Sequence, residues 1–353
     1  MIPSTLCENA DELAISERYL QLTDGVPVNM PKINVLPLIS ESMGARSLCT
    51  FLETPDIKIL LDPGISLARR WNLLPHPIEY RILLENRRQI VEYAEKSDVV
   101  TISHYHFDHC SPTFLDYRWT FSTPETAQQI FRNKLVLAKD YRAKINPTQR
   151  RRGWMLRKQI ENIVQEFQPA DDRVFTFGDT VIHFSTPVFH GEPDNALGWV
   201  VMVSIRVENE CVLHASDVQG PMITSTFNSI LKVNPTLLYL GGPPQYLAGY
   251  RVDHQSIMQA QSNLLSLSQK IPTLIIDHHL LRGQDWTSFM QPIRSVALAE
   301  NHHVFTAAEY DSQPNQPLES ERRRLYEENP PSTEFLNWSH RSKDQQRIIP
   351  PPI

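Results

Sequence analysis

The stretch Ser103-His104-Tyr105-His106-Phe107-Asp108-His109-Cys110 decides the fold class of this chain. It places four strong metal ligands, in the pattern His-x-His-x-Asp-His, within six residues. Imidazole and carboxylate together suit zinc and other late first-row divalent metals. A folded chain has little structural reason to crowd such side chains, so the cluster predicts metal binding.

The apolar run Asp98-Val99-Val100-Thr101-Ile102-Ser103 leads directly into this cluster and predicts a short buried strand. Alternate residues of a strand face the same side, so we expect His104 and His106 to bind one metal ion. Asp108 and His109 begin the next segment and can reach a second ion.

Further ligand candidates stand at the ends of other expected strands. They are Asp62 in Lys58-Ile59-Leu60-Leu61-Asp62-Pro63-Gly64, His190 in Phe189-His190-Gly191, Asp217 in His214-Ala215-Ser216-Asp217, and His278 in Ile275-Ile276-Asp277-His278-His279. In this order, over about residues 33 to 305, the motifs resemble those of the metallo-β-lactamase-fold hydrolases. The resemblance implies an α/β fold, a four-layer αββα sandwich of two mixed β-sheets with helices outside. The phrases at 42–47, 216–221 and 277–282 resemble most closely a branch of this superfamily that carries no assigned substrate.

The resemblance also divides the ligands between two metal ions. It assigns one ion to His104, His106 and His190, the other to Asp108, His109 and His278, and both to a bridging Asp217. Two ions at roughly 3.5–4 Å share a water and lower its pKa, which implies a hydrolase that uses a metal-bridging hydroxide. Histidine at position 106 favours zinc, because the related di-iron proteins usually place glutamate there; manganese and iron stay open.

The last ligand has two candidates, His278 and His279. In a strand one side chain faces the site and the next faces away, so we expect only one of them to point inward. We prefer His278, because Arg282 follows it at the spacing seen in related RNA-processing members.

The expected catalytic residues are a metal ligand, a residue that orients a ligand, and a proton donor. They are Asp108, Asp62, whose family counterpart orients a ligand histidine, and His254, which could protonate a leaving group. Candidates for binding a phosphate or carboxylate of the substrate are Arg46, Arg251 and Arg282, with surface ion pairing as the alternative for each.

The net charge is −6, yet between Arg132 and Lys158 ten basic residues accompany one acid, Asp140. Such a run predicts either a solvated helix face or an electropositive wall beside the metals.

We therefore expect hydrolysis of an anionic ester, with a phosphodiester or RNA-like substrate as the first candidate. The alternatives are a small-molecule thioester or lactone hydrolase and a metal-binding module without activity. Arginines at 142–152 would favour the phosphodiester if they line the metal cleft, and the small ester if they lie on the far side.

The chain of 353 residues is 41% hydrophobic and 21% charged, which is typical of a soluble protein. It has no apolar run of roughly 20 residues, so we expect no membrane span. The start, Met1 to Glu8, lacks a basic segment followed by an apolar one, which predicts a cytoplasmic protein without a secretory signal. Its four dispersed cysteines argue against a disulfide framework. No feature indicates the oligomeric state.

The chain divides into three expected parts. These are an N-terminal extension at 1–30 with a helix near 9–22, a hydrolase domain at 31–310 with a basic helical insert at about 125–168, and a Pro-rich charged tail at 311–353, extended or disordered apart from a short helix near 319–329. Within the domain we expect helices at 76–98, 124–138 and 149–166 and a strand at 118–122.

Overall fold

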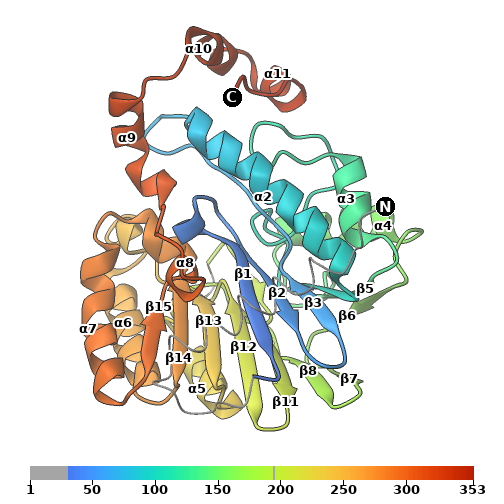
Figure 1. The fold of residues 1–353 in the computed structure, drawn as a ribbon, viewed down its shortest axis with the longest axis vertical. Coiled ribbons are helices and arrows are strands. Elements are labelled where there is room, and N and C mark those ends of the chain that lie inside the picture. Colours follow the sequence, from blue (N-terminus) through green and yellow to red (C-terminus); the bar gives the residue numbers. More distant parts are fainter. Residues whose placement is uncertain (1–30, 194) are drawn as a thin grey trace, which may run out of the picture.

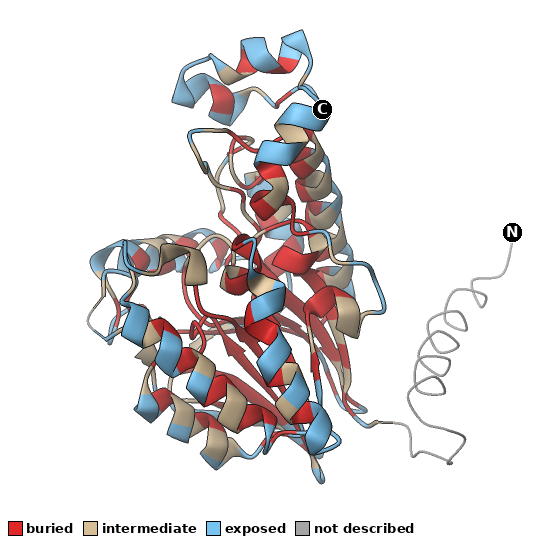
Figure 2. Ribbon diagram, turned by 90° about the vertical axis from the view of Figure 1, so that its left-hand side faces the viewer, coloured by how far each residue is buried: buried red, intermediate tan, exposed pale blue. Residues whose placement is uncertain are grey.

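The computed structural model describes residues 31–193 and 195–353, so the N-terminal extension and its expected helix lie outside the described residues. Two large β-sheets pack face to face, and helices cover the outer face of each (Figure 1). Figure 2 shows the strands buried in the middle and the helices with one buried and one exposed side. The predicted four-layer αββα sandwich is confirmed.

The first sheet carries the histidine cluster at its edge. Its strands, in spatial order, are β1 Asn34–Ser40, β2 Leu48–Glu53, β3 Lys58–Leu61, β4 Val99–Ile102, β5 Leu135–Ala138 and β6 Glu166–Pro169. β3, β4, β5 and β6 run parallel. Parallel pairing brings the ends of β3 and β4 to the same edge, so Asp62 and the cluster that begins at His104 emerge side by side.

The second sheet supplies the remaining ligand candidates. Its strands, in spatial order, are β15 His303–Phe305, β14 Thr273–Asp277, β13 Leu237–Gly241, β12 Glu210–Ser216, β11 Val203–Val207, β8 Thr180–Phe184 and β7 Val174–Phe177. β12 to β15 are parallel, so Asp217 after β12 and His278 after β14 also share one edge. A separate two-stranded pair, β9 Val188–Phe189 and β10 Trp199–Val200, places His190 between its strands.

Three apolar clusters hold the layers together. The first packs α2 Pro77–Lys96, α3 Pro124–Phe131 and α4 Pro147–Ile160 on the first sheet. The second packs α5 Thr224–Val233, α6 His254–Ser268 and α7 Trp286–Ala299 on the second sheet. The third fills the space between the sheets with alternate residues of both, such as Leu52 and Ile205.

The expected helix at 76–98 is α2, and its limits follow from local chemistry. His76 caps its first turn, where Glu79 bonds back to the His76 N–H, and Pro77 occupies the first helical position. Tyr80, Leu83 and Ile90 lie on its buried side. The helix ends at Lys96, before the strand that carries the cluster.

The expected basic helical insert is corrected by the structure. The helix after Pro124 ends at Phe131, and residues expected to continue it form β5. Asn133 has a φ of 58°, which no helix continues, and the apolar run after it pairs with β4 instead. Because β6 then pairs with β5, the segment belongs to the sheet.

Two smaller expectations also differ. The residues at 118–122 form no strand; only an isolated bridge joins Asp116 to Ser122, and Phe121 has a φ of 46°. The helix α5 was not anticipated.

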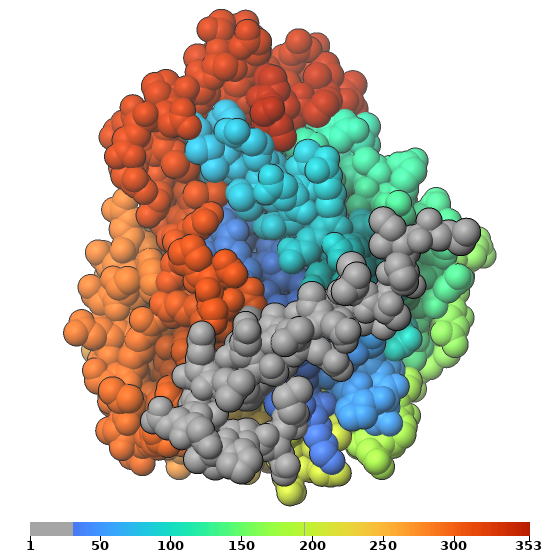
Figure 3. Space-filling view, in the orientation of Figure 1, coloured from blue at the N-terminus to red at the C-terminus, as the bar shows by residue number. Residues whose placement is uncertain are grey.

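The C-terminal tail is helical and packed, which corrects the expected extended or disordered segment. After the short helix α8 Ala307–Tyr310, it forms α9 Leu318–Glu328, which matches the short helix expected there, α10 Thr333–Ser339 and α11 Lys343–Ile348. Four of the seven prolines in 311–353 fall between these helices and three follow α11, so none interrupts a helix of the tail. Phe335 and Trp338 are buried and their rings contact Tyr80 of α2, so the tail lies against that helix (Figure 3).

Among the described helices, none combines the length and the apolarity needed to cross a membrane.

Candidate metal centre

Three histidines converge on one point at the end of β4. His104 and His106 follow the strand, and His190 reaches them from the turn between β9 and β10. The Nε2 atoms of His104 and His190 each lie 3.2 Å from the Nδ1 of His106. This arrangement brings together the three histidines expected to hold one ion.

The second predicted group also assembles. The Nε2 of His109 lies 3.3 Å from the Nε2 of His278, and the Oδ2 of Asp108 lies 3.6 Å from the same His278 atom. These three side chains therefore form a second set of ligand atoms that can surround a metal ion.

Asp217 lies between the two groups. Its Oδ2 is 3.0 Å from the Nε2 of His190, 3.7 Å from the Nε2 of His109 and 3.6 Å from the Nε2 of His278. Its Oδ1 is buried and has no hydrogen-bond partner in the described part of the chain. A carboxylate placed in this way can contribute to both groups.

Both His278 and His279 point inward, which makes the expectation of strand alternation wrong. β14 ends at Asp277, and residues His278–Arg282 form a 3-10 helix that begins with a φ of 60° at His278. The Nε2 of His279 lies 3.0 Å from the Oδ2 of Asp217. Alternation applies only within a strand, so it says nothing about two residues that follow its last position.

Asp62 contacts the cluster at the position from which it is predicted to orient a ligand histidine. Its carboxylate accepts hydrogen bonds from the Ser103 N–H at 2.7 Å and from the hydroxyls of Ser103 at 2.6 Å and Ser216 at 2.7 Å. It lies 3.0 Å from the Nδ1 of His109. A proton on that nitrogen leaves the Nε2 of His109 free to bind a metal.

Gly64 allows the loop after β3 to approach the cluster. A Cβ atom at this position would lie 2.2 Å from the Cys110 nitrogen and 2.4 Å from the His109 backbone. Only glycine permits this contact, so the Pro-Gly turn is a requirement of the site.

Two positioning residues were missed in the sequence. Glu41, in the 3-10 helix Glu41–Met43, lies 3.2 Å from the Nδ1 of His278 and accepts a hydrogen bond from Arg282. Gln149 of α4 accepts from the Tyr105 N–H at 3.0 Å and lies beside the His106 ring. Neither residue belongs to a recognised motif. The only signals in the sequence are that Glu41 directly precedes the motif at 42–47 and that Gln149 lies within the basic run.

The protonation states favour metal binding. Burial lowers the pKa of His104 well below its usual range and, with His190, lowers the pKa of His106 to about 3. Burial alone would raise the pKa of Asp217, but His190 and His279 outweigh it and hold that pKa well below its usual range. Neutral imidazole and ionised carboxylate are the forms that bind metals.

His278 behaves differently. Burial and Arg282 lower its pKa, but Asp217 and Glu41 outweigh them and raise it to about 9. Binding of a metal at its Nε2 would therefore release a proton. The crowded ring nitrogens and the unpartnered Asp217 oxygen fit a divalent cation, and the imidazole and carboxylate donors suit zinc.

The two groups open into a cleft of about 490 Å³ that contains several arginines. The arginines that line it are Arg46, Arg69, Arg152, Arg282 and Arg347. Arg46 pairs with Glu319 through two contacts of 2.6 Å, and Arg282 pairs with Glu41 at 3.0 Å. In the described chain, the other three have no carboxylate within ion-pairing distance.

Two expected site residues do not reach this cleft. Arg251 and His254 are exposed and are not among the residues that line it. The Arg251 and Val252 N–H groups bond to the Leu247 carbonyl, so the chain turns back at this point and Arg251 lies over the Tyr250 ring instead. The geometry of this cleft therefore does not support the expected roles of His254 as proton donor and of Arg251 in substrate binding.

The basic run divides between two surfaces. Arg152 lines the metal cleft, where its guanidinium lies 4.0 Å from the Phe107 ring centroid. Arg150 and Arg151 line a different hollow on the outer side of α4. Of these three arginines, only Arg152 therefore contributes to the electropositive surface expected beside the metals.

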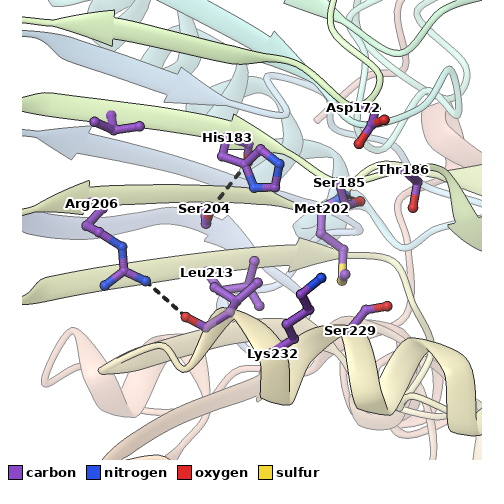
Figure 4. A pocket seen from close by; sticks show the side chains of 12 residues that line it. Asp172, His183, Ser185, Thr186, Met202, Ser204, Arg206, Leu213, Ser229 and Lys232 are labelled. Atoms are coloured by element: carbon purple, nitrogen blue, oxygen red, sulfur yellow. Dashed lines mark hydrogen bonds between the residues drawn. The ribbon is translucent and has the colours of Figure 1, made fainter.

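A third hollow, of about 410 Å³, lies between α5 and strands β8 and β11 (Figure 4). Two of its polar side chains bond to the backbone, Ser204 to the His183 carbonyl and Arg206 to the Val233 carbonyl. The ligand groups found among the described residues all lie elsewhere, at the strand ends.

Comparison with known proteins agrees with this geometry. Residues 46–217 match the model of the beta-lactamase superfamily domain. A UPF0282 protein of Korarchaeum cryptofilum is 38% identical over 308 residues, which cover 87% of this chain and 99% of that protein. A UPF0282 protein of Methanopyrus kandleri is 37% identical, with coverage of 83% and 99%. Among solved structures, the metallo-beta-lactamase fold protein YhfI of Bacillus subtilis is similar, with 13% identity, a TM-score of 0.46, and coverage of 78% of this chain and 97% of that one. The chain therefore belongs to the UPF0282 family, and its residues 46–217 are similar to the beta-lactamase superfamily domain.

Proposed function

We propose that this protein is a binuclear metallohydrolase that cleaves an anionic ester, with a phosphodiester of RNA as the first candidate substrate. The observation that carries the proposal is the position of Asp217 between two groups of ligand atoms at the floor of an arginine-lined cleft. Zinc is the expected metal, with manganese or iron as alternatives.

The proposed ligands divide as the sequence motifs indicate. His104, His106 and His190 would hold one ion; Asp108, His109 and His278 would hold the other, with Asp217 shared and His279 as a further ligand candidate. Two bound cations would supply an activated water and a Lewis acid for the ester oxygen. Asp62 and Glu41 orient His109 and His278, and Arg69, Arg152 and Arg347 offer unpaired positive charge to the substrate.

A metal and activity assay tests this proposal. Protein purified without chelator should carry close to two metal ions per chain, mostly zinc, by elemental analysis. It should hydrolyse bis(p-nitrophenyl) phosphate and a small RNA faster than a thioester or a lactone. Asp217→Ala is the matched inactive variant, and it should lose both metal and turnover, whereas Asp62→Ala should lose about 10–100-fold in metal affinity or activity.

One observation favours a second candidate, a small-molecule thioester or lactone hydrolase. Arg150 and Arg151 lie outside the cleft, so the region around the metals carries less positive charge than the basic run indicates. Preferential turnover of the uncharged esters would select this candidate. Full metal content without turnover of any substrate would select the third, a binding module without catalysis, and a metal content near zero after zinc supplementation would exclude all three.

A further inference from the structure

The outer face of α4 carries a hollow that the proposed metal chemistry does not use. It measures about 440 Å³ and is lined by Tyr141, Arg142, Pro147, Arg150, Arg151 and Trp154. Trp154 is 51% exposed, an unusual state for the largest aromatic side chain. Because Leu156 and Ile160 on another side of the helix provide its packing, Trp154 is not required to hold α4 in place.

The hollow has positive charge that no described carboxylate neutralises. Arg142 is paired, since its guanidinium makes two contacts of 2.9 Å with Asp140. Arg150 and Arg151 are exposed and have no carboxylate within ion-pairing distance in the described chain. The Arg150 guanidinium donates to the Arg142 carbonyl at 3.4 Å, and neither arginine is neutralised by a described carboxylate. Two such guanidinium groups beside an open indole match a single-stranded nucleic acid, whose bases stack on aromatic rings and whose phosphates pair with arginine.

The same helix connects this hollow to the metal cleft. On its inner side, Gln149 accepts the Tyr105 N–H next to the histidine cluster, and Arg152 lines the cleft. A Cβ at Gly153 would lie 2.7 Å from atoms of both Tyr105 and Tyr141, so glycine lets α4 pack closely against the residues that border the cluster and the hollow. Arg150 and Arg151 at the hollow and Arg152 at the cleft therefore carry positive charge on two sides of the same helix.

We propose that the outer face of α4 binds a single-stranded RNA segment that extends from the substrate bond held in the metal cleft. Trp154 stacks on a base, and Arg150 and Arg151 contact the flanking phosphates. This inference rests on the proposed function and names its substrate class, an RNA strand longer than the cleft itself. An acidic polypeptide could use the same arginines, but it lacks the planar bases that Trp154 would bind.

Binding of RNA can be measured separately from its hydrolysis. The zinc-loaded full chain is titrated against a labelled, cleavage-resistant single-stranded RNA of about 12 nucleotides, a length within the usual range of such sites, by fluorescence anisotropy. Trp154→Ala should weaken binding about 5- to 150-fold, the range found for the loss of one stacked base. The double variant Arg150→Gln/Arg151→Gln should reduce the slope of log K against log salt by about 1.4, because each single-strand phosphate contact contributes about 0.7.

The matched control is Lys158→Gln, on the same helix, since Lys158 is exposed and lies 3.6 Å from Glu161. This variant should bind RNA as the parent does, and all variants should hydrolyse bis(p-nitrophenyl) phosphate at the parental rate. Parental RNA affinity in both hollow variants would overturn the inference, and so would equally tight binding of a poly-glutamate peptide. If RNA binding depends on Trp154 but no phosphodiester is hydrolysed, the result would support the RNA-binding surface on α4 and contradict the proposed hydrolase function.

Discussion

His278 and His279 show how a single backbone angle determines the surroundings of the candidate metal centre. The positive φ of His278 ends the strand and turns both rings toward Asp217. Glu41 and Arg282 then surround His278, while Gln219 lies 3.2 Å from the Nε2 of His279. At the scale of the residue, the site therefore depends on contacts among three separate segments of the chain.

Removing either histidine should lower metal content. His278→Ala should reduce the metal content from two ions toward one, because it removes a member of the Asp108 and His109 group. His279→Ala should weaken binding about 10–100-fold if it acts through Asp217 and more if it binds directly. Elemental analysis after dialysis against limiting zinc measures both effects. His303→Ala, which replaces an exposed histidine on β15, is the control. If the His279→Ala variant kept its metal content, His278 would be the ligand of this pair and His279 would not.

At the scale of the element, α9 attaches the C-terminal tail to the rest of the molecule. Arg322 is fully buried and pairs with the equally buried Glu79 of α2 through contacts of 2.8 and 2.7 Å. It also donates to the Ala68 carbonyl, next to Arg69 at the cleft. Glu319, one turn earlier, pairs with Arg46 in the cleft itself. The helix thus holds two segments that border the metal site.

Replacing Arg322 should destabilise the fold. Arg322→Ala leaves Glu79 buried without its partner, which typically costs about 3–5 kcal/mol of unfolding free energy. Urea unfolding of the full chain measures the change. Arg324→Ala on the same helix removes only exposed pairs with Glu321 and Glu328 and should have little effect. Equal stability of the two variants would mean that α9 does not depend on the buried pair.

At the scale of the whole molecule, the candidate ligands come from both sheets. His104, His106, Asp108 and His109 follow the first sheet, whereas Asp217 and His278 follow the second. Ions bound between them would link the two halves, in addition to the apolar cluster that fills the space between the sheets.

Removing metal should therefore lower the temperature of unfolding. A ligand that binds only the folded state stabilises it by about 2.7 kcal/mol when its free concentration is 100 times its dissociation constant. Thermal unfolding monitored by circular dichroism, with zinc and with chelator, measures this difference. Asp217→Ala should show a much smaller chelator effect, because the shared ligand is gone. A parental unfolding temperature unchanged by chelator would argue against metals between the sheets.

The features of this protein that depend on local pattern could be predicted from the sequence. Neighbouring residues were enough to recognise the His-x-His-x-Asp-His cluster and the strands β3, β4 and β14. They also identified His190 and Asp217, which follow in the order of the family's motifs. An apolar run that ends in a polar ligand has few other structural outcomes, since the run must be buried and the ligand must reach a surface or a partner.

Which distant residues meet depends on how the whole domain packs, and no local pattern shows it. The run that became β5 is a strand because β4 lies beside it, and the proline-rich tail is folded because Phe335 and Trp338 find Tyr80. Glu41 is a partner of His278 although the sequence separates them by the whole domain. Arg152 faces the metals while Arg150 and Arg151 face another hollow, because successive residues of a helix point in different directions and only the packing of α4 sets which direction is inward.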